Sequence, residues 1–192
     1  MTALVLGLLL FLGLHSSRIV AESARSRFIA QRGPRAWRGL YSLGSALGLV
    51  LIIWGYGLAR HQSAALWSPP AWTRPLAAAL MLVSFVLLAA TYVPGNGIKA
   101  RVGHPMLLSV TVWAAAHVLA NPTAADLLLF GAFLLWAVFC FRKARARDRA
   151  EGRRPQPGRL SATVTAMAVG FGVWCATLLW LHRWLFGASP LS

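Results

Sequence analysis

The sequence predicts an all-α membrane protein, a polytopic bundle of about six transmembrane helices with both termini outside. Three observations predict this class: the composition is strongly apolar, the apolar residues fall into six stretches, and basic residues gather in alternate loops. Of the 192 residues, 58% are hydrophobic and only 12% are charged. Soluble domains carry about 25% charged residues, and disordered chains are much less apolar. The composition therefore argues against a soluble globular enzyme and excludes a disordered chain.

Six apolar stretches approach the length of roughly 20 helical residues that a bilayer requires. Together they predict a single transmembrane domain over residues 1–192. The fourth and fifth stretches are short, and the Asn-Pro-Thr-Ala segment 121–124 between them predicts a tight helical hairpin, because Asn-Pro ends a helix. Thr123 and Asp126 fit the start signal of the following helix. The stretches are 2–20, 39–58, 75–93, 105–120, 125–141 and 162–185.

The second stretch contains a motif for close helix packing. Gly44 and Gly48 form a Gly-x-x-x-Gly step. Such steps let two helix backbones approach closely. We expect a packing face within the bundle rather than a contact between two copies of the chain.

Basic residues are distributed unevenly between the loops. The chain has 19 Lys and Arg residues against 4 Asp and Glu residues. Fifteen of the 19 lie in the loops 21–38, 94–104 and 142–161, which the six-span topology places on one side. Because basic loops remain in the cytoplasm, this pattern predicts a multi-pass protein with the lipid bilayer as its partner and both termini outside. No nucleic-acid-binding motif accompanies the charge, so no nucleic-acid partner is expected.

His117 lies deep in the fourth stretch. Polar and aromatic residues spaced by four share its helix face, namely Ser109, Trp113, His117 and Asn121. A buried imidazole in hydrocarbon is costly unless it has a partner. The partner could be an interhelical hydrogen bond or a metal.

His15 lies near the cytoplasmic end of the first stretch. With Arg18 and Glu22 it has the i, i+3, i+7 spacing of a single helix face. Ionisable residues inside a span usually face the bundle interior and often mark function. We favour a functional role for His15. For Arg18 and Glu22 an interfacial cluster, with Arg18 reaching the lipid phosphates, is equally supported.

The other three histidines lie at the ends of spans. His104 precedes Pro105, and proline is favoured at the first position of a helix, so His104 occupies a cap-like site. His61 and His182 lie in or beside the outer loops. We expect both of them to be ordinary interfacial residues.

Two intramembrane histidines on separate helices predict a haem site. Neutral imidazole is a standard ligand of haem iron, and the core of a helical bundle is a natural cofactor site. The expected metal ligands are His15 and His117, and His104 is the alternative partner of His15. Burial favours His117, because water can satisfy His104. Arg18 could pair with a haem propionate. Zinc or copper would require more ligands, and no third group is obvious.

Two segments resemble motifs of the NnrU family of bacterial membrane proteins. They are the opening run GLLLFLGLHSSR at 7–18 and Gly103-His104-Pro105 followed by Trp113-Ala-Ala-Ala-His117. In that family a Gly-His-Pro and a Trp-Ala-x-x-His bracket one helix. The resemblance covers most of the chain. It implies a protein of the bacterial cytoplasmic (inner) membrane with a role linked to denitrification, in nitrite or nitric oxide reduction.

The NnrU family is also similar to zeta-carotene isomerase of plants and cyanobacteria, an integral membrane protein that binds haem b through histidines. On that similarity His15 and His117 match the axial ligand positions, and His104 matches a further histidine of the motif. This chain has alanine rather than cysteine at 114–116, so a thiolate ligand beside His117 is absent.

The resemblance leaves three functions open. The first is a haem-binding protein with redox-linked chemistry in nitrogen-oxide reduction. The second is a haem-dependent isomerase that acts on an apolar small molecule, a lipid such as a carotenoid. The third is a non-enzymatic accessory protein that assists the assembly of a nitrogen-oxide reductase, whose components would be its partners.

Overall fold

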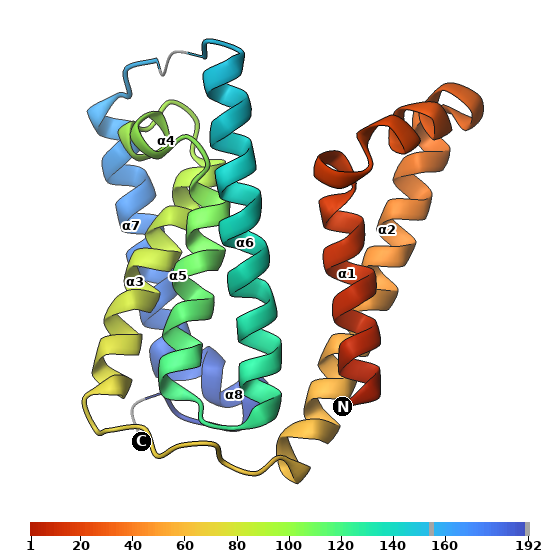
Figure 1. The fold of residues 1–192 in the computed structure, drawn as a ribbon. Coiled ribbons are helices and arrows are strands. Elements are labelled where there is room, and N and C mark those ends of the chain that lie inside the picture. Colours follow the sequence, from red (N-terminus) through yellow and green to blue (C-terminus); the bar gives the residue numbers. More distant parts are fainter. Residues whose placement is uncertain (154–155, 191–192) are drawn as a thin grey trace. The chain divides into compact units, whose positions relative to one another are not determined.

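The computed structural model describes residues 1–153 and 156–190. Every regular element in these residues is a helix, as the sequence predicts, and Figure 1 shows their order. The elements are α1 (Thr2–Val20), α2 (Glu22–Gln62), α3 (Thr73–Tyr92), α4 (Gly97–Val102), α5 (Pro105–Ala120), α6 (Ala124–Ala150), α7 (Leu160–Ala176), the π-helical η1 (Thr177–Leu181) and α8 (His182–Phe186).

The chain divides into two compact units, which are described one at a time. Unit 1 consists of Met1–Trp67 and Thr123–Ala132. Unit 2 consists of Ser68–Pro122 and the chain from Phe133 onward. The helix α6 therefore contributes its first turns to unit 1 and the rest of its length to unit 2.

Five helical stretches of the described chain are long and apolar enough to cross a membrane. They are α1, α2, α3, α6 and the continuous stretch Leu160–Phe186. The fourth predicted span is present as α5 with the predicted bounds, but its 16 residues are short for a spanning helix. The all-α class is confirmed, with five long apolar helices and one shorter helix where six spans were expected.

In unit 1, α1 and α2 pack with their backbones in close approach, because glycines line the interface. A Cβ atom at Gly48 would lie 2.9 Å from the backbone nitrogen of Phe11, and one at Gly55 would overlap the backbone nitrogen of Leu4. A Cβ atom at Gly44 would lie 2.5 Å from Leu14 Cδ1. The predicted packing face at Gly44 and Gly48 is confirmed, and it extends to Gly55.

The basic segment 21–38 was expected to be a loop, and this was wrong. The helix α2 begins at Glu22, and its one break is at Gly33, where φ is 83° and ψ is 161°. Glycine adopts positive φ without strain, and the following Pro34 disfavours helical geometry in the residue before it. A segment rich in arginine lacks the apolar periodicity that marks a helix in a sequence, and this explains the error.

Asp126 joins the start of α6 to α2 within unit 1. Its carboxylate accepts hydrogen bonds from the Thr123 backbone nitrogen at 3.0 Å and from the Thr123 hydroxyl at 2.6 Å. The Tyr56 hydroxyl donates to its other oxygen at 2.5 Å. The start signal at Thr123 and Asp126 is thus confirmed, and a negative charge at this position also suits the helix dipole.

Unit 2 is organised around α3, which packs against α5 on one side and α7 on another. The Ser84 hydroxyl donates to the Ser109 carbonyl at 2.9 Å and links α3 to α5. The Trp174 indole nitrogen donates to the Ala78 carbonyl at 2.9 Å and links α7 to α3. At Gly170 a Cβ atom would lie 2.5 Å from the Val86 Cα, so α7 also approaches α3 closely.

The loop 94–104 contains the helix α4, which the sequence analysis did not predict. The Asn96 side chain caps it by accepting from the Lys99 backbone nitrogen at 2.8 Å, and Asn96 is only 1% exposed. The Gly97 backbone nitrogen donates to the Thr163 hydroxyl of α7 at 2.8 Å. These bonds hold α4 against the start of α7.

The predicted span 125–141 extends as α6 to Ala150, so the first part of the expected loop 142–161 is helical instead. Alanine and arginine are both good helix formers, which explains the extension. The rings of Trp113 and Phe133 meet at 5.5 Å, and His104 contacts Asp148 at 2.7 Å. The later part of α6 therefore runs antiparallel to α5, as the hairpin at 121–124 predicted.

The last predicted span, 162–185, is not one uniform helix. The helix α7 passes into the π-helical turn η1 and then into α8. Gly187 ends α8 with a φ of 70°, a left-handed conformation that glycine favours. The chain then turns back, and the Ala188 carbonyl lies 2.8 Å from His182 Nδ1.

Candidate functional site

His15 is half-buried within unit 1, against the α2 side chain Tyr41. Its Nδ1 donates a hydrogen bond to the Phe11 carbonyl at 2.7 Å. Its ring stacks on Phe11 at 4.1 Å and lies 5.2 Å from the ring of Tyr41. Because the proton is on Nδ1, the lone pair of the neutral ring is on Nε2. In metal-binding histidines, the ring nitrogen that does not bind the metal commonly donates a hydrogen bond of this kind, which orients the ring.

Arg18 lies on α1 three residues after His15, as expected, but Glu22 does not continue this helix face. The helix α1 ends at Val20, and Ala21 has non-helical angles of φ −137° and ψ 34°. Glu22 opens α2 instead and forms an ion pair with Arg25 at 3.0 Å. Arg18 is exposed in the last turn of α1.

His117 is half-buried within unit 2, in the last turn of α5. Its Nδ1 donates to the Trp113 carbonyl at 2.8 Å, and its own carbonyl accepts from the Asn121 amide at 2.9 Å. The Trp113 and His117 rings are 5.3 Å apart. Three residues of the predicted stripe, Trp113, His117 and Asn121, are thus in contact along α5, whereas Ser109 bonds to Ser84 of α3. The neutral ring of His117 has its proton on Nδ1 and its lone pair on Nε2, as in His15.

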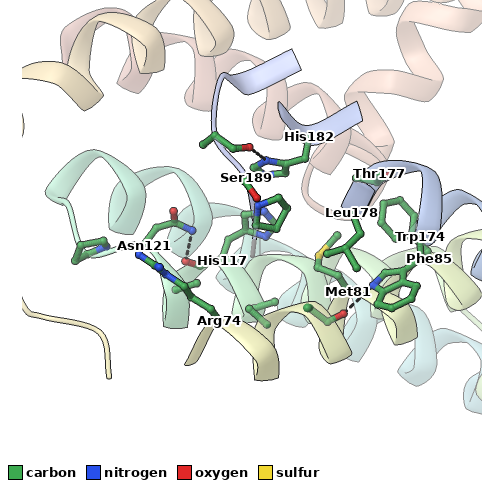
Figure 2. Close-up of a pocket in the computed structure, with 17 residues that line it drawn as sticks. Arg74, Met81, Phe85, His117, Asn121, Trp174, Thr177, Leu178, His182 and Ser189 are labelled. Atoms are coloured by element: carbon green, nitrogen blue, oxygen red, sulfur yellow. Dashed lines mark hydrogen bonds between the residues drawn. The ribbon is translucent and has the colours of Figure 1, made fainter. Parts of the chain in front are cut away.

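A cavity of about 330 Å³ opens over His117. It lies within unit 2, between α3, the end of α5 and the segment from Trp174 to Pro190 (Figure 2). Met81, Phe85 and Leu178 give it an apolar wall, and it is in the size range of small-molecule sites. Its polar lining residues include Arg74, His117, Asn121, Thr177, His182 and Ser189.

His182 lines this cavity, although the sequence predicted an ordinary interfacial residue. Its Nδ1 donates to the Ala188 carbonyl at 2.8 Å, which again leaves the lone pair on Nε2. Figure 2 shows His182 entering the cavity from α8 and His117 from α5. The π-helical turn η1 directly precedes His182, and such turns frequently occur at functional sites. No local sequence signal marks a π turn, so sequence analysis could not have found this arrangement.

His104 occupies the N-cap of α5, as expected, at the other end of unit 2. Its Nε2 donates to Asp148 Oδ2 at 2.7 Å. Asp148 lies about two turns beyond Phe141, outside the apolar part of α6. Desolvation raises the pKa of Asp148, but the hydrogen bond from His104 and the charges of His104 and Arg153 outweigh it, so this pKa lies below its usual value. His104 therefore has a carboxylate partner of its own.

The donor set restricts which metal centres the chain could form. Across residues 1–153 and 156–190, no group of three or more His, Cys, Asp or Glu side chains is placed to hold a metal ion. A structural zinc site needs four such ligands. A haem iron needs only one or two axial ligands from the protein, and single imidazoles with Nε2 lone pairs suit that role.

The sequence of the whole chain was compared with known protein families. Residues 3–190 match the family described as NnrU protein. The chain belongs to the NnrU family. The match to NnrU includes His15, His104, His117 and His182, so both units are part of the region that defines the family. None of the curated proteins or solved structures compared with the chain matches it significantly.

Proposed function

We propose that this NnrU protein binds haem b through His15 and His117 in the bacterial cytoplasmic membrane, as a multi-pass protein linked to nitrite or nitric oxide reduction. One observation carries the haem proposal. His15 and His117 each donate from Nδ1 to the carbonyl four residues earlier, so in each neutral ring the lone pair that would bind iron is on Nε2. The family resemblance supplies the link to denitrification.

The surroundings of His117 support this assignment over His104. The cavity of about 330 Å³ gives His117 room for a ligand, and its wall at Met81, Phe85 and Leu178 suits a flat apolar body. His104 Nε2 is engaged by Asp148 at 2.7 Å. Arg18, which is exposed at the end of α1, remains the proposed partner of a haem propionate.

The test is a pyridine haemochrome assay on detergent-purified protein, with His15→Ala and His117→Ala as the ligand variants. We expect haem in the wild type and reduced haem occupancy in both variants. His61→Ala is the matched control, because His61 is an exposed histidine at the end of α2. If His15→Ala and His117→Ala keep the occupancy of the control, the ligand assignment is wrong.

A second function, haem-dependent isomerisation of an apolar lipid such as a carotenoid, is favoured by the composition of the cavity. Apolar side chains line most of it next to His117. An apolar substrate would enter from the bilayer rather than from water. The discriminating experiment incubates haem-loaded protein with a cis-carotenoid and follows the isomer ratio. An unchanged ratio with fully loaded protein would remove this alternative and leave haem binding standing.

The third alternative, an accessory protein for a nitrogen-oxide reductase, requires no bound cofactor. It predicts a denitrification defect on deletion together with cofactor-free pure protein that co-purifies with reductase components. The haemochrome assay separates it from the first two functions, because bound haem contradicts the cofactor-free form.

A further inference from the structure

A second pocket, of about 370 Å³, lies at the opposite end of α5 from the His117 cavity, within unit 2. It is lined by α4, the final turns of α6 and residues 156–158. Its lining includes three basic side chains from three different segments: Lys99 of α4, Arg145 of α6 and Arg153 after α6. Nothing in the proposed haem chemistry uses this pocket.

The charge of the lining is positive after its acid is accounted for. Asp148 is the carboxylate among the lining residues, and His104 donates to its Oδ2 at 2.7 Å. Its Oδ1 lies 3.8 Å from Arg153. Within residues 1–153 and 156–190, Lys99 and Arg145 have no carboxylate at ion-pair distance. The Lys99 ammonium also donates to the Thr91 carbonyl at 3.1 Å, a neutral partner that leaves its charge uncompensated. Two cations without a carboxylate partner among the described residues therefore line the pocket.

Glycines allow the pocket to take its shape. Gly103 has a φ of 77°, and a Cβ atom there would lie 3.1 Å from Arg145 Nη1. The missing side chain lets the Arg145 guanidinium lie against the turn between α4 and α5. At Gly158, an added Cβ would overlap the backbone of Gly97. With the Asn96 cap, this contact holds the backbone of α4, the helix that carries Lys99, against residue 158.

The level of the pocket along the helices indicates where its ligand would come from. The lining residues between 95 and 104 follow the end of α3 at Tyr92 and precede the start of α5 at Pro105. The pocket thus lies where the apolar helices meet the polar chain, at the depth of lipid headgroups. Basic pockets at this level on the cytoplasmic side commonly hold anionic headgroups.

We propose that the Lys99–Arg145 pocket binds a phosphate group, supplied by the headgroup of an anionic phospholipid or by free phosphate. The Arg145 guanidinium can donate two parallel hydrogen bonds to phosphate oxygens, and the Lys99 ammonium supplies a point charge beside them. This proposal goes beyond the proposed function and does not depend on haem.

The test titrates the full-length detergent-purified protein with phosphatidylglycerol or phosphatidylcholine and counts bound lipid by native mass spectrometry. We expect a preference for phosphatidylglycerol, and about tenfold weaker binding in Arg145→Gln, the loss typical of one charge-assisted contact. Lys99→Gln should weaken binding severalfold and serves if Arg145→Gln fails to fold. Arg149→Gln is the matched control, because Arg149 is exposed on the same helix and outside the pocket lining.

A third arm distinguishes the two sources of phosphate. The protein is incubated with millimolar inorganic phosphate. If phosphate binds, if binding requires Arg145, and if phosphatidylglycerol does not compete with it, the ligand is free phosphate. Arg145-dependent lipid binding that inorganic phosphate does not displace would identify the headgroup. Equal losses in Arg145→Gln and Arg149→Gln would show only general attraction to a basic surface and overturn the proposal, as would no binding of either probe.

Discussion

Units 1 and 2 each carry a histidine of the same local geometry in different surroundings. His15 and His117 both donate from Nδ1 to the carbonyl four residues earlier. In unit 1 the ring is stacked on Phe11 beside Tyr41. In unit 2 the ring of His117 lines a cavity of about 330 Å³. Two imidazoles with the same hydrogen bond thus differ in their surroundings: packing leaves a ligand-sized space beside His117, whereas the printed ring contacts of His15 are with aromatic side chains.

The packing of each unit depends on glycines, so we expect the greatest loss of stability when a glycine at a helix contact is replaced by a larger residue. Gly55→Val should destabilise unit 1 by roughly 3 kcal/mol, because the new side chain would overlap the backbone of Leu4. The measurement is unfolding by SDS titration, followed by far-UV circular dichroism. Gly57→Val is the control, since nothing lies within 4 Å of a Cβ atom there. Equal losses in the two variants would mean that the α1–α2 contact is not as close as described.

The corresponding contact in unit 2 should respond somewhat less. In Gly170→Val the side chain would meet Val86 of α3, with a Cβ-to-Cα distance of 2.5 Å before relaxation. We expect a loss of about 2 kcal/mol, since overpacking usually costs 1–3 kcal/mol. Gly172→Val, with open space around its Cβ position, is the matched control. If Gly170→Val unfolds like the wild type, α3 and α7 do not approach closely.

A hydrogen bond in unit 1 tests whether that unit also depends on polar contacts. Tyr56→Phe removes the donor to the buried carboxylate of Asp126. A hydrogen bond to a charged group contributes about 1.5–3 kcal/mol. Because Thr123 still donates to Asp126 in the variant, we expect the free energy of unfolding to fall by only about 1.5 kcal/mol in the same assay. Tyr92→Phe, at a tyrosine that is 71% exposed, should be neutral. A neutral Tyr56→Phe would contradict the buried pair.

The smallest expected effect is the pH dependence of the ion pair in unit 2. The pKa of Asp148 is lowered, so its contribution to stability is present above the ordinary aspartate pKa of about 3.9 and is lost as the pH falls through the lowered value. His104, Arg153 and Arg147 are the groups that interact with it. Asp148→Asn should flatten the acid side of a stability profile measured between neutral pH and pH 3. A profile identical to that of the wild type would show that the pair is not formed.

Local signals in the sequence predicted part of this fold accurately. Pro105 and the Asn121-Pro122 pair set the bounds of α5, and Thr123 with Asp126 set the start of α6. These signals act within one turn of the residues they affect. The helical part of 21–38 was missed because its arginines mask any apolar period.

The candidate site was only partly predictable, because its decisive contacts join residues that are distant in the sequence. The cavity role of His182 depends on the π turn η1 and on the return of the chain after Gly187. The engagement of His104 depends on Asp148, 44 residues later. Histidine positions could be read from the sequence, whereas the space around them follows from packing.

The proposed function depends on His117 presenting Nε2 to a ligand inside the unit 2 cavity. The most direct measurement is the Soret spectrum of His117→Gly with and without added imidazole. We predict that the variant loses the wild-type spectrum and that imidazole restores it, because the enlarged cavity can hold the missing ring. A wild-type spectrum in His117→Gly without imidazole would contradict the claim.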